Sequence, residues 1–273
     1  MAKKALNEMS FLDHLEELRW LLVRSSAAVV IMGIVSYFFA DFIFSDLIFG
    51  PTDPSFITYR FFCEATHYLG FADSICITEL NFIIQNTQME GQVNIFVWVC
   101  ITAGFILAFP YILWELWKFI SPALYEKEKK LARPLLLAAT VLFYLGCAFT
   151  YFLLLPVMFA YLNSTAPAGV AMMTDIGKYL DFVIVLLLAG GLSFEVPIAV
   201  LIGVLLGWVT VAQLVEWRGY IVVAIFIVAA IITPPDGLSQ IMLAVPMWLL
   251  YELGIVVARV LVKQRQHAKA DSL

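Results

Sequence analysis

The feature that most constrains this chain is a series of apolar runs, each about 20 residues or longer, separated by polar segments. A helix of about 20 residues crosses the roughly 30 Å of hydrocarbon in a bilayer and satisfies its own backbone polar groups there. Of the 273 residues, 63% are hydrophobic and 14% are charged, whereas a soluble domain is about half apolar and a quarter charged. The sequence therefore predicts an all-α, polytopic membrane protein.

We predict six membrane-spanning helices within a single integral membrane domain that covers residues 1–273. The predicted spans are 20–44, 93–119, 134–162, 179–208, 217–232 and 238–257. The fifth span is about 24 Å long at 1.5 Å per residue, and the turn "TPPDG" joins it closely to the sixth. We therefore expect the last two helices to be short.

Lysine and arginine residues are distributed unequally between the two sides of these spans. Fourteen of them fall on the side of both termini, whereas only Arg60 and Lys178 fall on the other side. Cytoplasmic loops are the ones enriched in lysine and arginine. Both termini are therefore predicted to be cytoplasmic.

The first outer loop, residues 43–92, is the one long polar segment between spans, and it is acidic. It holds Cys63 and Cys76, which could pair on an oxidising face of the membrane. Two free thiols are the alternative, and the sequence leaves both open. Cys100 and Cys147 fall inside predicted helices, where we expect them to act as small packing residues.

The chain lacks the short motifs of common enzyme classes. It contains no GxxxxGK[ST] nucleotide-binding loop, no HExxH or CxxC motif and no GxSxG nucleophile elbow. We therefore expect no enzymatic activity, no cofactor, no metal site and no nucleic-acid partner.

One carboxylate, Glu195, lies near the middle of the predicted span 179–208. Insertion scales give a cost of roughly 2.5–3.5 kcal/mol for a charged residue at a helix centre, so such residues face a protein interior or a wet cavity. Pro197 removes a backbone hydrogen bond and is expected to kink the helix here. A functional role is favoured, and a buried protonated glutamate bonded to a neighbouring helix is the alternative.

Two polar segments on the side of the termini carry further carboxylates: "MSFLDHLEELRWLLVR" at the start of the chain and "KFISPALYEKEKKLARP" after the second span. The first is amphipathic and could simply anchor the chain at the interface. The second could be an ordinary positive loop. The functional alternative is that their carboxylates bind a cation.

Four motifs in order carry a resemblance over nearly the whole chain: "HLEELR" at 14–19, "FISPALYEKEKK" at 119–130, "LSFEVP" at 192–197 and "TPPDGLSQIMLAVPM" at 233–247. Together they resemble the TatC family, the receptor subunits of the twin-arginine protein translocase. The resemblance implies six helices that form a concave wall in a bacterial inner membrane. It also implies binding of folded precursors by their twin-arginine signal peptides, assembly with the single-span subunits TatA and TatB, several copies per complex, and transport driven by the proton-motive force.

The same resemblance assigns site residues. Glu17 and Glu128 match the two carboxylates that bind the signal arginines, and a guanidinium meets a carboxylate through two parallel hydrogen bonds that lysine cannot copy. The positions that shape the same cytoplasmic site are matched by Arg19, Phe119, Pro122, Leu124 and Tyr125. Pro51 matches the family's proline after the first span, and Glu195 matches the glutamate that lines the concave face. Gln240, which follows Asp236, matches a polar position where partner helices dock.

Two other functions remain open from the residues alone. An ion-coupled secondary transporter would use Glu195 as its coupling carboxylate, but it should show paired broken helices in two related halves, and the sequence contains no such repeat. A structural or assembly protein without a substrate is the second alternative.

Overall fold

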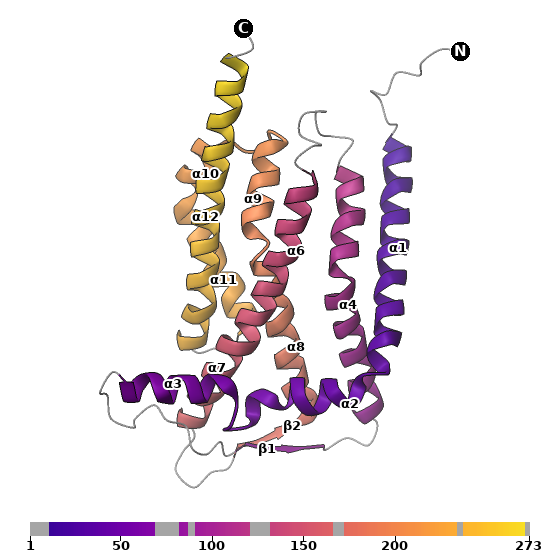
Figure 1. Ribbon diagram of the computed structural model, residues 1–273, viewed down its shortest axis with the longest axis vertical. Helices are drawn as coiled ribbons and strands as arrows, with labels where there is room; N and C mark the ends of the chain where they lie inside the picture. Colours follow the sequence, from indigo (N-terminus) through magenta and orange to yellow (C-terminus); the bar gives the residue numbers. More distant parts are fainter. Residues whose placement is uncertain are drawn as a thin grey trace. The chain divides into compact units, whose positions relative to one another are not determined.

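The computed structural model describes residues 11–68, 82–86, 91–120, 132–165, 172–233 and 237–270, and most of these are helical (Figure 1). The chain divides into two compact units. The first consists of Met1–Phe38 and Cys100–Thr140, and the second of Phe39–Val99 and Val141–Leu273.

In the first unit, α1 (Phe11–Tyr37) packs against α4 (Gly91–Ile120) at a pair of glycines. A Cβ atom built on Gly104 would lie 2.5 Å from the Gly33 nitrogen and 2.6 Å from the Val29 carbonyl oxygen. No side chain fits in that space, so the two backbones touch directly. Small residues allow this kind of close packing between helices in lipid, where the hydrophobic effect does not drive helices together. The first unit also contains the start of α6 (Ala132–Phe149).

The second unit is built around buried side chains of η4, α7, α8, α11 and α12, with Leu154, Leu155 and Leu186 fully enclosed. Its helical elements are α2 (Ala40–Phe42), η1 (Ile43–Ile48), η2 (Gly50–Thr52), α3 (Ile57–Tyr68), η4 (Thr150–Leu154), α7 (Leu155–Thr165), α8 (Ile176–Ser193), α9 (Val196–Leu205), α10 (Val211–Glu216), α11 (Arg218–Ile232) and α12 (Gly237–Ala270).

Glycines also bring α6 and α8 together within the second unit. A Cβ on Gly146 would lie 2.7 Å from the Gly190 carbonyl oxygen, and a Cβ on Gly190 would overlap the Thr150 hydroxyl. Gly191 lies against the Phe143 ring in the same way. The glycines of "LAGGLS" are therefore a helix contact that places the following residues, including Glu195.

Two short strands, β1 (Phe82–Gln85) and β2 (Met172–Asp175), pair in parallel in the second unit, with Phe82 opposite Met172 and Gln85 opposite Asp175 (Figure 1). The sequence did not predict them. Four residues are too few for a period-2 pattern to stand out, and parallel pairing joins segments that are distant in the chain.

Five helices in the described part of the chain are long and apolar enough to cross a membrane. They are His14–Tyr37, Val93–Ile120, Pro134–Ser164, Ile176–Leu205 and Ser239–Gln264, which match the first four predicted spans and the sixth. The predicted span 217–232 is present as α11, an apolar helix of 15 residues. It is short, as expected.

The ends of two spans differ from prediction. The first ends at Tyr37 and not at residue 44, because the apolar residues that follow form α2 and the π-helix η1. The expectation that the last helix is short is wrong, since α12 has 34 residues. Hydropathy marks only its apolar part, whereas the charged residues that follow are good helix formers and continue the same helix.

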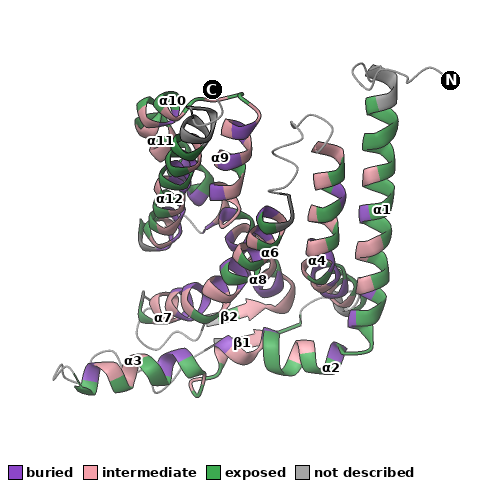
Figure 2. Ribbon diagram, turned by 45° about the horizontal axis from the view of Figure 1, so that its top comes forward, coloured by how far each residue is buried: buried purple, intermediate pink, exposed green. Residues whose placement is uncertain are grey.

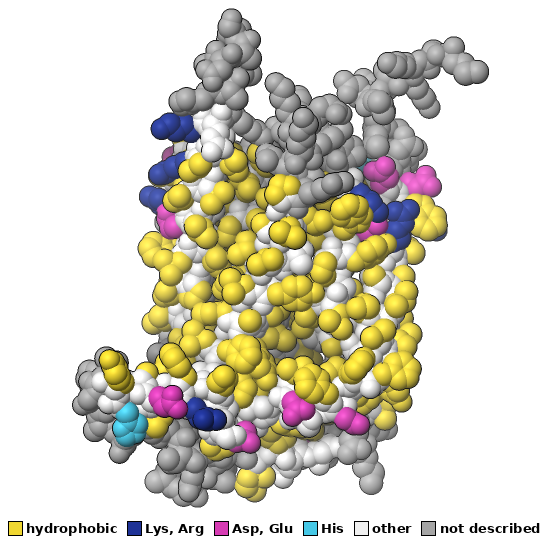
Figure 3. Space-filling view, viewed as in Figure 1, with side chains coloured by type: hydrophobic (Ala, Val, Ile, Leu, Met, Phe, Trp, Pro, Cys, Tyr) yellow, Lys and Arg dark blue, Asp and Glu magenta, His cyan; other side chains and the backbone are white. Residues whose placement is uncertain are grey.

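Large apolar side chains stay exposed along the spans. Only 6% of the apolar stretch of α1 is buried, and Figure 2 shows most of that helix as exposed. On the face shown in Figure 3, hydrophobic side chains form a broad central area, whereas Lys, Arg, Asp and Glu lie towards its upper and lower margins. Such surfaces suit lipid and would be unstable in water.

We predict that Gly104→Ala destabilises the α1–α4 contact, because the added methyl group meets backbone atoms of Gly33 and Val29 that cannot rotate away. Overpacking of this kind costs about 1–3 kcal/mol, which should appear as a lower thermal unfolding temperature in detergent micelles. Gly219→Ala is the matched control, since no atom of the described residues lies within 4 Å of a Cβ at that position. Equal unfolding temperatures for both variants would show that the glycine contact is unimportant.

Candidate functional site

A cavity of about 420 Å³ lies between α1 and α4 within the first unit. The close approach at Gly33 and Gly104 holds the two helices side by side, and beyond it α1 presents a polar turn opposite the end of α4. The residues that line the cavity are Glu16, Glu17, Trp20, Leu21 and Arg24 from α1, and Glu115, Lys118 and Phe119 from α4.

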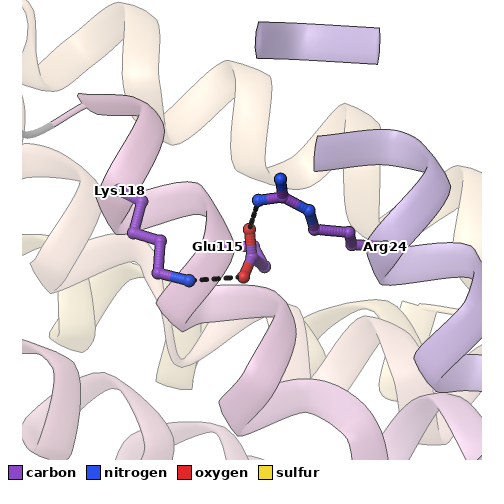
Figure 4. A network of polar contacts seen from close by, with 3 residues as sticks. All are labelled: Arg24, Glu115 and Lys118. Atoms are coloured by element: carbon purple, nitrogen blue, oxygen red, sulfur yellow. Dashed lines mark hydrogen bonds and ion pairs between the residues drawn. The ribbon is translucent and has the colours of Figure 1, made fainter. Parts of the chain in front are cut away.

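The carboxylate of Glu115 connects the two walls of this cavity (Figure 4). The Lys118 ammonium donates to Glu115 Oε1 at 2.7 Å, and Arg24 Nη1 donates to Glu115 Oε2 at 3.3 Å. Each oxygen of Glu115 therefore has a cationic partner, which a buried charge requires.

Exposure differs sharply within this group. The Glu115 side chain is 3% exposed, whereas Arg24 and Lys118 are about half exposed, at 51% and 52%. Each cation also lies over an indole ring, Arg24 at 5.9 Å from the centroid of Trp20 and Lys118 at 5.7 Å from that of Trp114. The anion is thus buried beneath two cations that the aromatic rings and the carboxylate hold in place.

The structure brings together some of the residues that the sequence assigned to the cytoplasmic site. Glu17 and Phe119 line the same cavity, and His14 stacks on the Phe119 ring at 4.4 Å between centroids. Arg19 is exposed on α1 and is absent from the residues that line the cavity. The other four assigned residues lie outside the described residues: Pro122, Leu124, Tyr125 and Glu128.

Sequence reasoning missed Arg24, Glu115, Lys118 and Trp20 as members of this site. It counted the two cations only as markers of orientation. A signal for Glu115 was present in "LWELWKF", where an acidic residue inside an apolar run has a lysine three positions later. No local signal identifies Arg24, because its partner is 91 residues away.

The second predicted site centres on Glu195, which lies between α8 and α9. Pro197 stands in the first turn of α9, so the predicted interruption of this span is confirmed. Glu195 Oε1 is buried and has no hydrogen-bond partner among the described residues. A buried polar atom without a partner is costly, and such groups often mark a site that a partner or water completes.

The other two residues assigned with Glu195 are placed differently. The Gln240 amide donates to the Phe226 carbonyl at 3.0 Å and so links α12 to α11, while Asp236 lies outside the described residues. An ion pair of 2.6 Å between Arg218 and Glu252 makes a second link between the same helices.

The segment after the first span is held by buried hydroxyl groups. Pro51 is fully buried, and its carbonyl accepts a hydrogen bond of 2.9 Å from the Tyr59 hydroxyl, which also contacts the Pro156 carbonyl at 3.2 Å. Burial raises the pKa of Tyr59 above its usual range, so the hydroxyl remains a donor. The Tyr179 hydroxyl donates a hydrogen bond of 2.6 Å to the carbonyl of Ile48, three residues before Pro51. Pro51 thus belongs to a rigid connection.

Of the two loop cysteines, Cys63 on α3 is disulfide-bonded, whereas Cys76 lies outside the described residues. Their pairing therefore stays a prediction. Cys100 and Cys147 are free and buried, as expected for packing residues. Among the residues that the structure describes, no group of three or more His, Cys, Asp or Glu side chains could hold a metal ion.

Comparisons with known proteins give a consistent result. The family model for "Sec-independent protein translocase protein (TatC)" matches residues 13–246. A protein of that name from Azotobacter chroococcum mcd 1 is 39% identical over 249 residues, which cover 91% of this chain and 88% of the relative. One from Blattabacterium sp. subsp. Periplaneta americana (strain BPLAN) is 36% identical over 265 residues, with 94% and 97% covered.

The fold has a close counterpart among solved structures. A crystal structure of the "Twin Arginine Translocase Receptor- TatC" superposes with a TM-score of 0.73 at 31% sequence identity. The match covers 90% of this chain and 99% of that one.

We predict that Tyr59→Phe destabilises the connection around Pro51, because two buried carbonyl oxygens lose their donor. The expected loss is about 1–3 kcal/mol in the free energy of unfolding, measured by thermal unfolding in detergent. Tyr220→Phe serves as control, since Tyr220 is 78% exposed. A Tyr59→Phe protein as stable as the control would contradict this assignment.

Proposed function

Because this chain belongs to the TatC family of Sec-independent protein translocase proteins, we propose that the cavity between α1 and α4 receives the arginine pair of a twin-arginine signal peptide. Family membership makes the chain a multi-pass membrane component of the protein translocase. The identity of the ligand and the residues that bind it are the proposal.

The observation that carries the proposal is the convergence of Glu16, Glu17 and Phe119 on one open space. Glu16 and Glu17 are exposed on α1, so their carboxylates are accessible to a ligand. A guanidinium binds a carboxylate through two parallel hydrogen bonds, which favours arginine over lysine. In this proposal Glu128 supplies the second arginine-binding carboxylate, and Arg19, Pro122, Leu124 and Tyr125 shape the site around it.

The distribution of lysine and arginine indicates which side of the membrane the cavity faces. Fourteen of the sixteen lysines and arginines lie on the side of the termini, so the cavity and both termini face the cytoplasm in this proposal. The signal peptide arrives on that face. TatA and TatB are the membrane partners, several copies of the chain assemble in the complex, and the proton-motive force drives transport. The concave wall expected from the resemblance stays a prediction.

Glu195 has a separate role in this proposal. Its buried, unpaired oxygen supports a polar contact point within the bilayer for a TatA or TatB helix. Gln240 and Asp236 contribute to docking of the same partners, and Pro51 belongs to the hydrogen-bonded segment that follows the first span.

We expect a photoreactive residue at Leu21, which lines the cavity, to crosslink to a radiolabelled precursor with an arginine pair in its signal peptide. The crosslink should be largely lost when the pair is changed to lysines, and also in the Glu17→Ala/Glu128→Ala variant, because the bidentate contacts are gone. The measurement is the yield of crosslinked precursor in membranes that contain the translocase.

A photoreactive residue at Val23 is the matched control, because Val23 is 50% exposed on α1 but does not line the cavity. It should give little crosslinking with either signal peptide. Equal labelling from Leu21 with the arginine and lysine peptides would disprove recognition in this cavity.

We also expect Glu195→Ala to reduce export of a twin-arginine precursor while binding of the signal peptide is retained, because Glu195 lies outside the binding cavity. Glu195→Gln should keep most export, since an amide still offers hydrogen bonds to a partner helix. Export is measured as the fraction of the precursor protein that reaches the periplasm. Loss of export in Glu195→Gln as complete as in Glu195→Ala would instead indicate that a titrating carboxylate is required.

A further inference from the structure

We infer that Glu115 is a specificity-determining positioning residue: it neutralises two cations built into the cavity and so leaves Glu16 and Glu17 available to a cationic peptide. This inference rests on the proposed function, because it concerns how the same cavity selects its ligand. Glu115 acts through Arg24 and Lys118, not by direct contact with the peptide.

The charges that line the cavity make such a group necessary. Besides Glu16 and Glu17, the part of the lining that the structure describes contains the two cations Arg24 and Lys118. Without Glu115 these four charges would cancel, and the cavity would present two fixed positive groups to an arginine pair. Like charges that face each other across an interface strongly disfavour binding. With Glu115 the described lining residues carry a net negative charge, which favours a cationic ligand.

The geometry shows that the two cations are in fact held by Glu115. Lys118 lies three residues further on the same helix, at 2.7 Å, and Arg24 reaches from α1, at 3.3 Å (Figure 4). The indole rings of Trp114 and Trp20 lie on these two cations as well. Arg24 and Lys118 are thereby oriented towards the buried carboxylate, and Glu16 and Glu17 remain exposed on α1.

The burial of Glu115 explains why this group does not bind the ligand itself. Its side chain is only 3% exposed, and each oxygen already has a cationic partner. A peptide arginine would have to displace one of these partners to reach it. Glu17 is exposed and carries no such restriction.

A purely structural role is the rival explanation, because the Arg24–Glu115 pair also joins α1 to α4. The two roles predict opposite effects when a cation is removed together with Glu115. If Glu115 serves to neutralise charge, removing Lys118 as well should restore binding. If Glu115 serves to hold the helices together, substituting Lys118 as well does not restore the lost link between α1 and α4, and binding of the peptide stays weak.

The test is a double-mutant cycle with the full chain in lipid nanodiscs. The probe is a fluorescent synthetic peptide with the sequence S-R-R-x-F-L-K, and its lysine-pair counterpart serves for comparison. Dissociation constants are measured for the wild type, Glu115→Gln, Lys118→Gln and the double variant. Glu252→Gln is the matched control, because it removes an ion-paired carboxylate on α12 in the second unit.

Glu115→Gln should weaken binding of the arginine peptide by at least about tenfold at low salt, with a smaller effect at high salt. Lys118→Gln should bind the peptide more tightly than the wild type. The double variant should return to within about threefold of the wild type, because the loss of one negative charge and the loss of one positive charge offset each other. Glu252→Gln should bind like the wild type. Unfolding temperatures of all variants identify any that fail to fold.

Two outcomes would overturn the inference and leave the proposed function intact. In the first, the wild type prefers the arginine peptide and Glu115→Gln binds it equally well. In the second, the double variant folds well but binds the peptide as weakly as Glu115→Gln. A wild type that does not distinguish arginine from lysine would overturn the proposed function, and the inference with it.

Discussion

Close backbone contact at glycine is the interaction on which the rest of this structure depends. Lipid tails are as apolar as leucine, so helices in a bilayer gain little from hiding apolar surface and rely on van der Waals contact. Gly33 and Gly104 provide that contact in the first unit, and Gly146 and Gly190 provide it in the second. The cavity between α1 and α4 exists because these helices touch at one level and carry polar side chains beyond it.

Two glutamates within the spans illustrate two ways to accommodate a carboxyl group in an apolar setting. Glu115 has a cation at each oxygen and is nearly inaccessible. Glu195 is placed at a helix interruption and leaves one buried oxygen without a partner. A paired buried charge orders its surroundings, whereas a buried polar atom without a partner is a place where another molecule can bind. The two residues therefore suit different tasks in one translocase subunit.

Membership of the TatC family decides between the functions that the residues alone left open. The described chain also offers a cavity lined by several carboxylates and long apolar helices that leave much of their surface exposed. The ion-coupled transporter reading rested on Glu195 alone and has no further support. The Tyr59 hydroxyl holds the chain around Pro51 through a hydrogen bond to the Pro51 carbonyl.

The sequence by itself determined the features that depend on local composition: the membrane class, the positions of the long apolar helices and the interruption at Pro197. Glu17 and Phe119 were assigned to one site by the resemblance to a family, and the structure places both beside the same cavity. Only the tertiary structure decided the pairing of β1 with β2, the continuation of α12 to Ala270, and the contact between Arg24 and Glu115. Hydropathy and proline act on residues within a few turns, so a single sequence reveals them. An ion pair between residues 91 positions apart depends on which helix faces meet, and in this chain glycine contacts decide that.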